Sequence, residues 1–296
     1  MALEQAGEQP RAIVREPAPW LSVPQITCDL CTVAPDDLAA ACAGAETIVH
    51  LAGEDELLAA RDPSAALGST VVASERLAEA GKTAGSRRLI YLSTVHVYGA
   101  RMQPGVTLTE DMRAEPRSAY AISRLASEHV TASLAADAYE LVILRLTNSI
   151  GAPANPAVDR WSLVANDLAR QGALTGRLRL NSAGVQWRDF VALSEVCRTI
   201  VAACRTGDPA LAPGTYNLGS GTPRTVLDLA HLVQDAFATQ TGERPELDAP
   251  PPPADPPGPY HVSVDRLAEQ GLGPSASVAD AVAETVGFCL RHRAEL

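Results

Sequence analysis

Two stretches of the sequence are the most informative: LSTVHVYG at residues 92–99 and YAISR at residues 120–124. The first ends an apolar run typical of a buried strand, so we expect Thr94 at the end of that strand. The second opens a helical pattern, with Tyr120 near the helix start and Arg124 one turn later on the same face. An alcohol and a phenol in this arrangement would form a proton-transfer pair, because a phenol can serve as a general acid or base.

Short apolar runs alternate with helical stretches through most of the chain. We expect strands at residues 11–15, 25–27, 46–51, 88–92, 141–146 and 215–218, and helices at 36–43, 65–80 and 121–135. This alternation predicts an α/β fold, a Rossmann-like doubly wound parallel sheet with helices on both faces. Farther on, helices are expected at 161–172, 194–204, 226–239, 265–270 and 278–292, and a strand at 177–180. The proline-rich run 249–259 should be an extended surface loop.

Composition limits the possible functions. The chain of 296 residues has 46% hydrophobic and 20% charged residues, enough for one doubly wound domain with a small cap. Its formal charge of −11 argues against a nucleic-acid surface. No apolar run is long enough for a membrane span, and the N-terminus lacks signal-peptide features, so we expect a cytoplasmic protein. Cys28 and Cys31 form a CxxC without a second pair, so no metal site is expected.

The order and spacing of these motifs resemble the extended short-chain dehydrogenase/reductase family, the NAD-dependent epimerases and dehydratases of the UDP-galactose 4-epimerase kind. Besides the two stretches above, the resemblance rests on HLAG at 50–53, RLTNSIGAP at 145–153, RDFV at 188–191 and YNLGSG at 216–221. It extends from residue 2 to about residue 290. The family's HLAA segment is HLAG here, and its lysine four residues after the tyrosine is Arg124.

The resemblance implies an NAD(P)-dependent enzyme that acts on a nucleotide-activated sugar or related polyol. Tyr120 would be the general acid/base, Thr94 would polarise the substrate oxygen, and Arg124 would orient the ribose and favour the phenolate. Arginine keeps the positive charge of the family's lysine but does not release its proton, so it cannot relay one. Dehydration needs a carboxylate beside the serine or threonine, and the chain has Val95 and His96 there, which favours an epimerase or ketoreductase.

The same resemblance assigns binding positions. The cofactor, NAD or NADP, would contact Arg15, Asp29, Leu30, His50, Leu51, Ala52, Gly53, Tyr120 and Arg124. Arg15 favours NADP because an arginine there can hold the 2′-phosphate, although an exposed Arg15 paired with Glu16 is an equal alternative. The substrate would contact Thr94, His96, Asn148 and Arg188, unless Arg188 only fixes a loop through an ion pair with Glu195.

Domain organisation and assembly also follow from the resemblance. Residues 1–150, with a returning segment at about 190–222, would form the dinucleotide-binding domain. Residues 151–189 and 223–296 would form the substrate-binding cap. Helices 65–80 and 121–135 would form the interface of a homodimer.

One family element is missing. No strand with a GxxGxxG turn precedes residues 11–15, and residues 2–15 resemble the end of the first helix and the second strand. In the strand order 3-2-1-4-5-6 the missing strand is central, so its neighbours would face each other across about 10 Å. A start codon placed too late, a genuine loss and a shortened chain are competing explanations. The alternative function is a non-catalytic binding or scaffold protein that has lost its cofactor chemistry.

Overall fold

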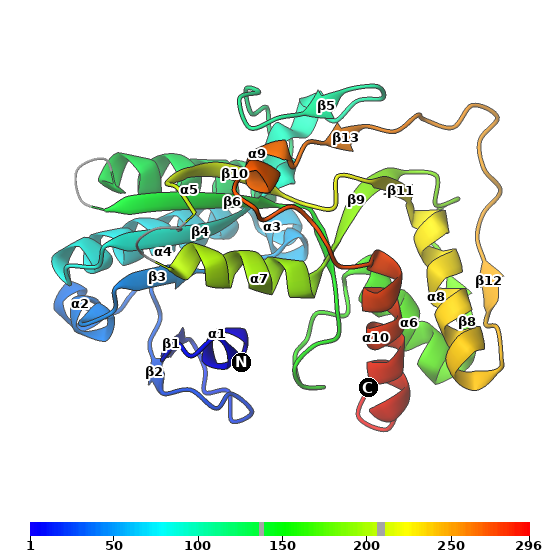
Figure 1. The fold of residues 1–296 in the computed structure, drawn as a ribbon, viewed down its shortest axis with the longest axis horizontal. Helices are drawn as coiled ribbons and strands as arrows, with labels where there is room; N and C mark the ends of the chain where they lie inside the picture. Colours follow the sequence, from blue (N-terminus) through cyan, green and yellow to red (C-terminus); the bar gives the residue numbers. More distant parts are fainter. Residues whose placement is uncertain (136–138, 206–210) are drawn as a thin grey trace. The chain divides into compact units, whose positions relative to one another are not determined.

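The computed structural model describes residues 1–135, 139–205 and 211–296, and the chain forms two compact units. The first unit comprises Met1–Arg101, Glu110–Leu146 and Cys197–Asn217. The second comprises Met102–Thr109, Thr147–Val196 and Leu218–Leu296. Because each unit is assembled from separate segments, the chain passes between them more than once, as the sequence colours in Figure 1 show.

A four-stranded sheet forms the centre of the first unit, in the order β10-β6-β4-β3. Its strands are β3 (Thr47–His50), β4 (Arg88–Thr94), β6 (Glu140–Leu146) and β10 (Gly214–Leu218). β4 runs parallel to β3 and β6, so the carboxyl ends of these three strands lie at one edge of the sheet. That edge carries His50 and Thr94, which brings two of the predicted site residues to the same end of the sheet.

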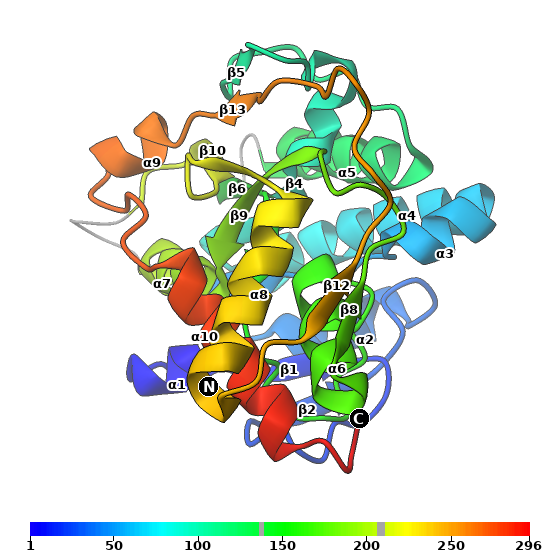
Figure 2. The ribbon, with the colours of Figure 1, turned by 90° about the vertical axis from the view of Figure 1, so that its right-hand side faces the viewer.

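Helices cover both faces of this sheet. α4 (Pro63–Thr83) and α5 (Ala119–Ala135) pack against each other on one face, and α7 (Leu193–Cys204) lies on the other (Figure 2). α4 begins at Pro63 because Asp62 accepts a hydrogen bond from the backbone N–H of Ala65 and because proline suits the first helical turn. The buried Arg88 donates to the carbonyl of Ala203, where a cation stabilises the C-terminal end of α7.

A separate parallel pair of strands, β1 (Ala12–Val14) and β2 (Gln25–Thr27), belongs to the same unit. The unit also contains three short helices: α1 (Ala2–Gln5), α2 (Pro35–Cys42) and α3 (Glu56–Arg61). Among the described residues β1 pairs only with β2, and β3 pairs only with β4. The two edges have therefore not closed up across the place of the missing central strand.

The second unit is built around three helices, α6 (Val164–Thr175), α8 (Val226–Thr241) and α10 (Val278–Arg291). Its strands are β5 (Thr107–Leu108), β7 (Asn148–Ile150), β8 (Arg177–Arg179), β9 (Trp187–Ala192), β11 (Pro223–Thr225), β12 (Glu246–Asp248) and β13 (His261–Val262), and α9 (Asp265–Glu269) follows β13. α6 and α8 approach closely because Gly172 has no side chain: a Cβ there would lie 2.4 Å from the Phe237 ring.

Each strand predicted within residues 11–218 is present, and the α/β fold class is confirmed. The prediction for residues 161–172 was wrong at its start, because α6 begins at Val164 and the Asn166 side chain donates to the Arg160 carbonyl, which holds the preceding turn. The described part of the chain contains no helix with the length and apolar character needed to cross a membrane.

Candidate active site

Four of the predicted residues come together at the carboxyl end of β4. Thr94 is the last residue of β4 and Tyr120 is the second residue of α5, and the Thr94 hydroxyl is close enough to the Tyr120 phenol to lower its pKa. The guanidinium carbon of Arg124 lies 5.3 Å from the centre of the Tyr120 ring. The His96 ring meets the Tyr120 ring edge to face, with 6.4 Å between centroids. The arrangement joins an alcohol, a phenol and a cation.

The turn that carries His96 has a backbone geometry that explains its glycine. The 3-10 helix η1 (Val95–Arg101) is interrupted at Gly99, where φ is 44°. A Cβ at Gly99 would lie 2.1 Å from the carbonyl oxygen of Glu115, so only glycine fits this close approach. Gly99 therefore lets the chain turn sharply after β4 while residues 115–116 pack against the turn.

Burial dominates the acidity of the Tyr120 phenol. It raises the pKa of Tyr120 above the usual value, while the positive charge of Arg124 and the neighbouring Thr94 hydroxyl act in the opposite direction. The phenol is thus protonated at neutral pH and ready to donate a proton. Removal of a proton from a substrate would need the phenolate form of Tyr120, which would become available only as the pH rises.

Arg124 makes contacts that sequence reasoning did not foresee. Its guanidinium is buried and donates from Nη1 to the Ala52 carbonyl (3.2 Å) and from Nη2 to the Glu54 carbonyl (3.3 Å). Between them, Gly53 has a φ of 145°, and a Cβ there would lie 2.6 Å from Arg124 Nη1. The arginine and the glycine of HLAG are therefore matched: the larger side chain fits on the 52–54 turn because Gly53 leaves room for it.

A buried polar network holds α5 on the sheet. The Ser93 hydroxyl donates to Glu128 Oε1 (2.5 Å), and Arg145 Nη2 donates to Glu128 Oε2 (2.7 Å). Arg145 Nη1 also donates to the Tyr98 hydroxyl (3.1 Å), which in turn donates to Asn217 Oδ1 (2.7 Å). Because Glu128 lies two turns after Tyr120 on α5, this network fixes the helix register that places the phenol beside Thr94.

A cavity of about 340 Å³ contains much of the predicted cofactor site. Of the predicted residues, Arg15, Asp29, Leu30, Ala52 and Gly53 line it. Asp29 Oδ1 accepts a hydrogen bond from the Cys31 N–H (2.8 Å), which fixes the turn after β2. The exposed Arg15 lies 3.8 Å from Glu54 Oε1, so its partner is Glu54 rather than Glu16.

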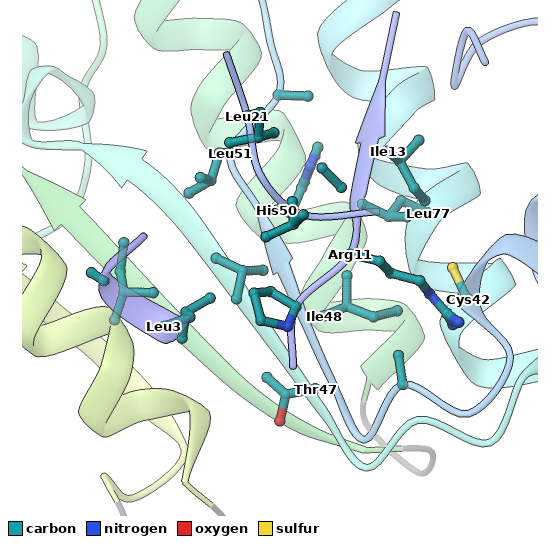
Figure 3. A pocket seen from close by; sticks show the side chains of 18 of the residues that line it. Leu3, Arg11, Ile13, Leu21, Cys42, Thr47, Ile48, His50, Leu51 and Leu77 are labelled. Atoms are coloured by element: carbon teal, nitrogen blue, oxygen red, sulfur yellow. The ribbon is translucent and has the colours of Figure 1, made fainter. Parts of the chain in front are cut away.

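His50 and Leu51 line a different cavity of about 450 Å³, bounded by β1 on one side and β3 on the other (Figure 3). The His50 ring is 1% exposed and lies 5.3 Å from the Tyr91 ring. Burial, with a smaller contribution from the charge of Arg124, lowers the pKa of His50 to about 3. His50 is therefore neutral across the physiological range, which suits an apolar wall.

Asn148 and Arg188 belong to the second unit. The Asn148 side chain on β7 donates to the Asp189 carbonyl (3.0 Å), and Arg188 on β9 donates to the carbonyl of Trp187 (2.8 Å). Burial raises the pKa of the neighbouring Tyr260, and Arg188 opposes that shift. Both residues are thus fixed by backbone contacts within their own unit.

Sequence reasoning missed Glu54 and Glu128. Glu54 lines the 340 Å³ cavity, and its carboxylate also accepts from the Ser69 hydroxyl (3.2 Å). Glu128 could have been found, because Arg145 stands within an apolar strand and a buried guanidinium needs an anionic partner. No comparable signal identifies Glu54, since its role depends on how α4 packs beside the 52–54 turn.

Comparison with known proteins identifies the family of the chain. Residues 2–219 match the NAD dependent epimerase/dehydratase family. The chain belongs to this family. The UDP-glucose 4-epimerase of Mycolicibacterium smegmatis is 30% identical over 258 residues, which cover 82% of this chain and 75% of that protein.

Other members differ in activity. The GDP-6-deoxy-D-mannose reductase of Pseudomonas aeruginosa is 28% identical over 195 residues, which are 64% of this chain and only 62% of the reductase. The structure of Thermus thermophilus UDP-glucose 4-epimerase in complex with NAD aligns with a TM-score of 0.79 at 24% identity, covering 97% of this chain and 92% of that one. This structural likeness establishes the Rossmann-like fold of the family.

Proposed function

We propose that this chain is an NAD(P)-dependent oxidoreductase or epimerase that acts on a nucleotide-activated sugar or a related polyol. The observation that carries the proposal is the Tyr120 phenol, which has the Thr94 hydroxyl beside it and the Arg124 guanidinium over its ring. The relatives include both an epimerase and a reductase of nucleotide sugars, in agreement with this class of reaction.

The residues at two ends of the predicted cofactor site fit a nicotinamide dinucleotide. At one end, the 340 Å³ cavity offers the Asp29 carboxylate for a hydroxyl or amine and the Arg15 guanidinium for a phosphate. At the other, Thr94, Tyr120 and Arg124 surround the reacting position. The Glu54 carboxylate lies 3.8 Å from the Arg15 guanidinium and partly neutralises its positive charge. We therefore expect at most a modest preference for NADP over NAD.

The catalytic work would be divided among three side chains. Thr94 would hold the substrate oxygen by a hydrogen bond, and Tyr120 would give a proton to that oxygen or remove one from it. Arg124 would stabilise the phenolate that forms in the second case, as a fixed charge rather than a proton relay. When bound, the nicotinamide supplies the hydride acceptor or donor. His96 stands where a dehydratase would need a carboxylate, which favours epimerisation or ketone reduction.

One observation favours the alternative, a non-catalytic binding protein derived from the same family. The Arg124 donors Nη1 and Nη2 are already used by the carbonyls of Ala52 and Glu54.

Cofactor binding separates the two functions. NADH and NADPH are titrated into the purified protein and followed by fluorescence and calorimetry. A Kd below about 100 μM, roughly −5.5 kcal/mol, supports the enzyme. Failure to bind either dinucleotide, combined with binding of UDP-, GDP- or dTDP-hexoses, supports the binding protein instead.

We also propose a homodimer formed through α4 and α5. Val72 on α4 is 37% exposed and Ile122 on α5 is 43% exposed, so each helix keeps an apolar side chain in reach of a partner. Light scattering at micromolar protein should give twice the monomer mass, and the monomer mass would contradict the dimer.

A further inference from the structure

The cavity between β1 and β3 is here called the slot. In the described part of the chain, the strand edge on each side of the slot has no paired strand. Backbone N–H of Ala12 donates to Pro24 and the Val14 carbonyl accepts from Cys28, so these two residues of β1 turn their backbone groups toward β2. Because backbone groups alternate along a strand, Ile13 turns its own away from β2. β1 thus presents a free edge on the side opposite its partner.

β3 presents the second edge. The Glu46 carbonyl accepts from the N–H of Arg88, so Glu46 and the alternate residues that follow it face β4. By the same alternation, Thr47, Val49 and Leu51 turn their backbone groups away from β4. All three line the slot, as does Ile13 (Figure 3). Backbone groups of β1 and of β3 therefore point into the slot from its two sides.

The walls of the slot are apolar and incompletely covered. They include Leu3, Ile13, Leu21, Ile48, Leu77 and Ile200. On α7, Cys197, Ile200 and Val201 form a stripe at helical spacing that lines the slot and is only half-buried. Leu51 is 56% exposed although it follows a strand of the central sheet. Uncovered apolar surface of this kind favours an apolar occupant.

His50 supplies an independent sign of a missing hydrogen-bond donor. The single hydroxyl hydrogen of Ser74 goes to the Thr70 carbonyl (2.8 Å), so Ser74 must accept from His50 Nε2 (2.9 Å). Nδ1 of the same ring is then a bare acceptor, and it is buried without a partner in the described part of the chain. The slot therefore borders a buried acceptor that no described residue satisfies.

We propose that the slot binds one extended apolar segment of polypeptide, supplied from outside residues 1–296, as a parallel strand between β1 and β3. Only a strand satisfies two parallel ladders at once, because its N–H and C=O groups alternate between both edges. Its side chains would be apolar and β-branched on both faces, since helices cover both faces of a parallel sheet. Its length would be about five residues.

A synthetic peptide tests the proposal on the full chain. The probe is an acetylated and amidated peptide of valine and isoleucine with a lysine at each end, about eight residues in all. The matched control carries the same side chains but is N-methylated at alternate residues, which removes its donors to one edge. Binding is measured by calorimetry, and amide hydrogen exchange is measured at Ile13, Thr47, Val49 and Leu51.

We expect the probe to bind and to slow exchange of these four amides at least about tenfold, while the N-methylated control does neither. Absence of binding at about 1 mM probe, or binding without protection of these amides, would overturn the proposal. Equal binding of the N-methylated control would mean that the peptide only adsorbs to apolar surface, and this result would also overturn the proposal. A dimer that the probe dissociates would show that a second copy occupies the slot instead.

A variant that places a charge in the wall of the slot tests the same proposal from the protein's side. Ile200→Glu should abolish binding of the probe, whereas Ser194→Glu, on an exposed position of the same helix, should retain it. Circular dichroism checks that both variants are folded. If Ile200→Glu does not fold, the comparison between the probe and the N-methylated peptide on the parent protein still tests the proposal. No cofactor takes part in the binding, so its outcome is independent of the proposed function.

Discussion

β4 and β1 are both apolar parallel strands of the first unit, yet their surroundings differ sharply. β4 pairs with β3 on one edge and β6 on the other, and all its residues except Leu92 are buried. β1 pairs only with β2, and each of its three residues is only half-buried. The difference shows that the burial of a strand in a parallel sheet depends on neighbours at both edges as well as on its own sequence.

The same contrast divides the candidate site. The end that holds Thr94 and Tyr120 stands on β4, β6 and α5. The Glu128–Arg145 pair joins α5 to β6, and the Ser93 hydroxyl joins β4 to Glu128. The end that holds Arg15 stands on the half-covered β1. We therefore expect the reacting end to be rigid, and the dinucleotide end to depend on what occupies the slot.

The largest effect is expected at Glu128. Glu128→Gln leaves the buried Arg145 without a counter-charge, so the free energy of unfolding should fall by about 3–5 kcal/mol. Denaturant titration measures the loss. Glu75→Gln, at an exposed position of α4, is the control and should stay within about 0.5 kcal/mol of the parent protein. If the two variants were equally stable, β4 and α5 would not be held together as described.

The match between Gly53 and Arg124 predicts a smaller, coupled effect. Gly53→Ala should reduce stability by about 1–3 kcal/mol, because the backbone is left-handed there and the new Cβ meets the guanidinium. Arg124→Lys should keep or raise activity if the site is catalytic. Lysine should also recover part of the Gly53→Ala loss, because the double variant removes the clash but not the backbone strain. Strictly additive losses would contradict the contact.

The smallest effect is expected at His50, which lines the slot and therefore tests the region around β1. Its pKa is lowered to about 3 in the folded state, against an ordinary value near 6.5, so the unfolded chain binds more protons between these values. Stability is therefore complete well above pH 6.5 and falls as the pH decreases, by roughly 1–2 kcal/mol at pH 5.5. His50→Gln should remove this slope, and His129→Gln, at an exposed position of α5, should keep it. An ordinary pKa for His50 would mean that water reaches the ring through the slot.

The sequence was a good guide to regular structure and a poor one to side-chain partners. The strands of the first unit were predictable because buried parallel strands have apolar sequences, and the open position beside β1 agrees with the strand order that the resemblance implied. The partner of Arg124 was not predictable, because an exposed arginine and one folded onto residues 52–54 have the same sequence signature. The short strands β5, β7 and β11 escaped prediction because two or three residues carry no measurable period.

Turnover by Tyr120→Phe is the most direct test of the proposed proton transfer. The variant lacks only the phenolic oxygen, so its turnover of a nucleotide sugar should fall about 10²–10⁴-fold while dinucleotide affinity stays close to that of the parent protein. Tyr139→Phe is the control and should keep its turnover, because the Tyr139 hydroxyl donates to the Ala78 carbonyl of α4 and lies outside the candidate site. Unchanged turnover in Tyr120→Phe would contradict the account.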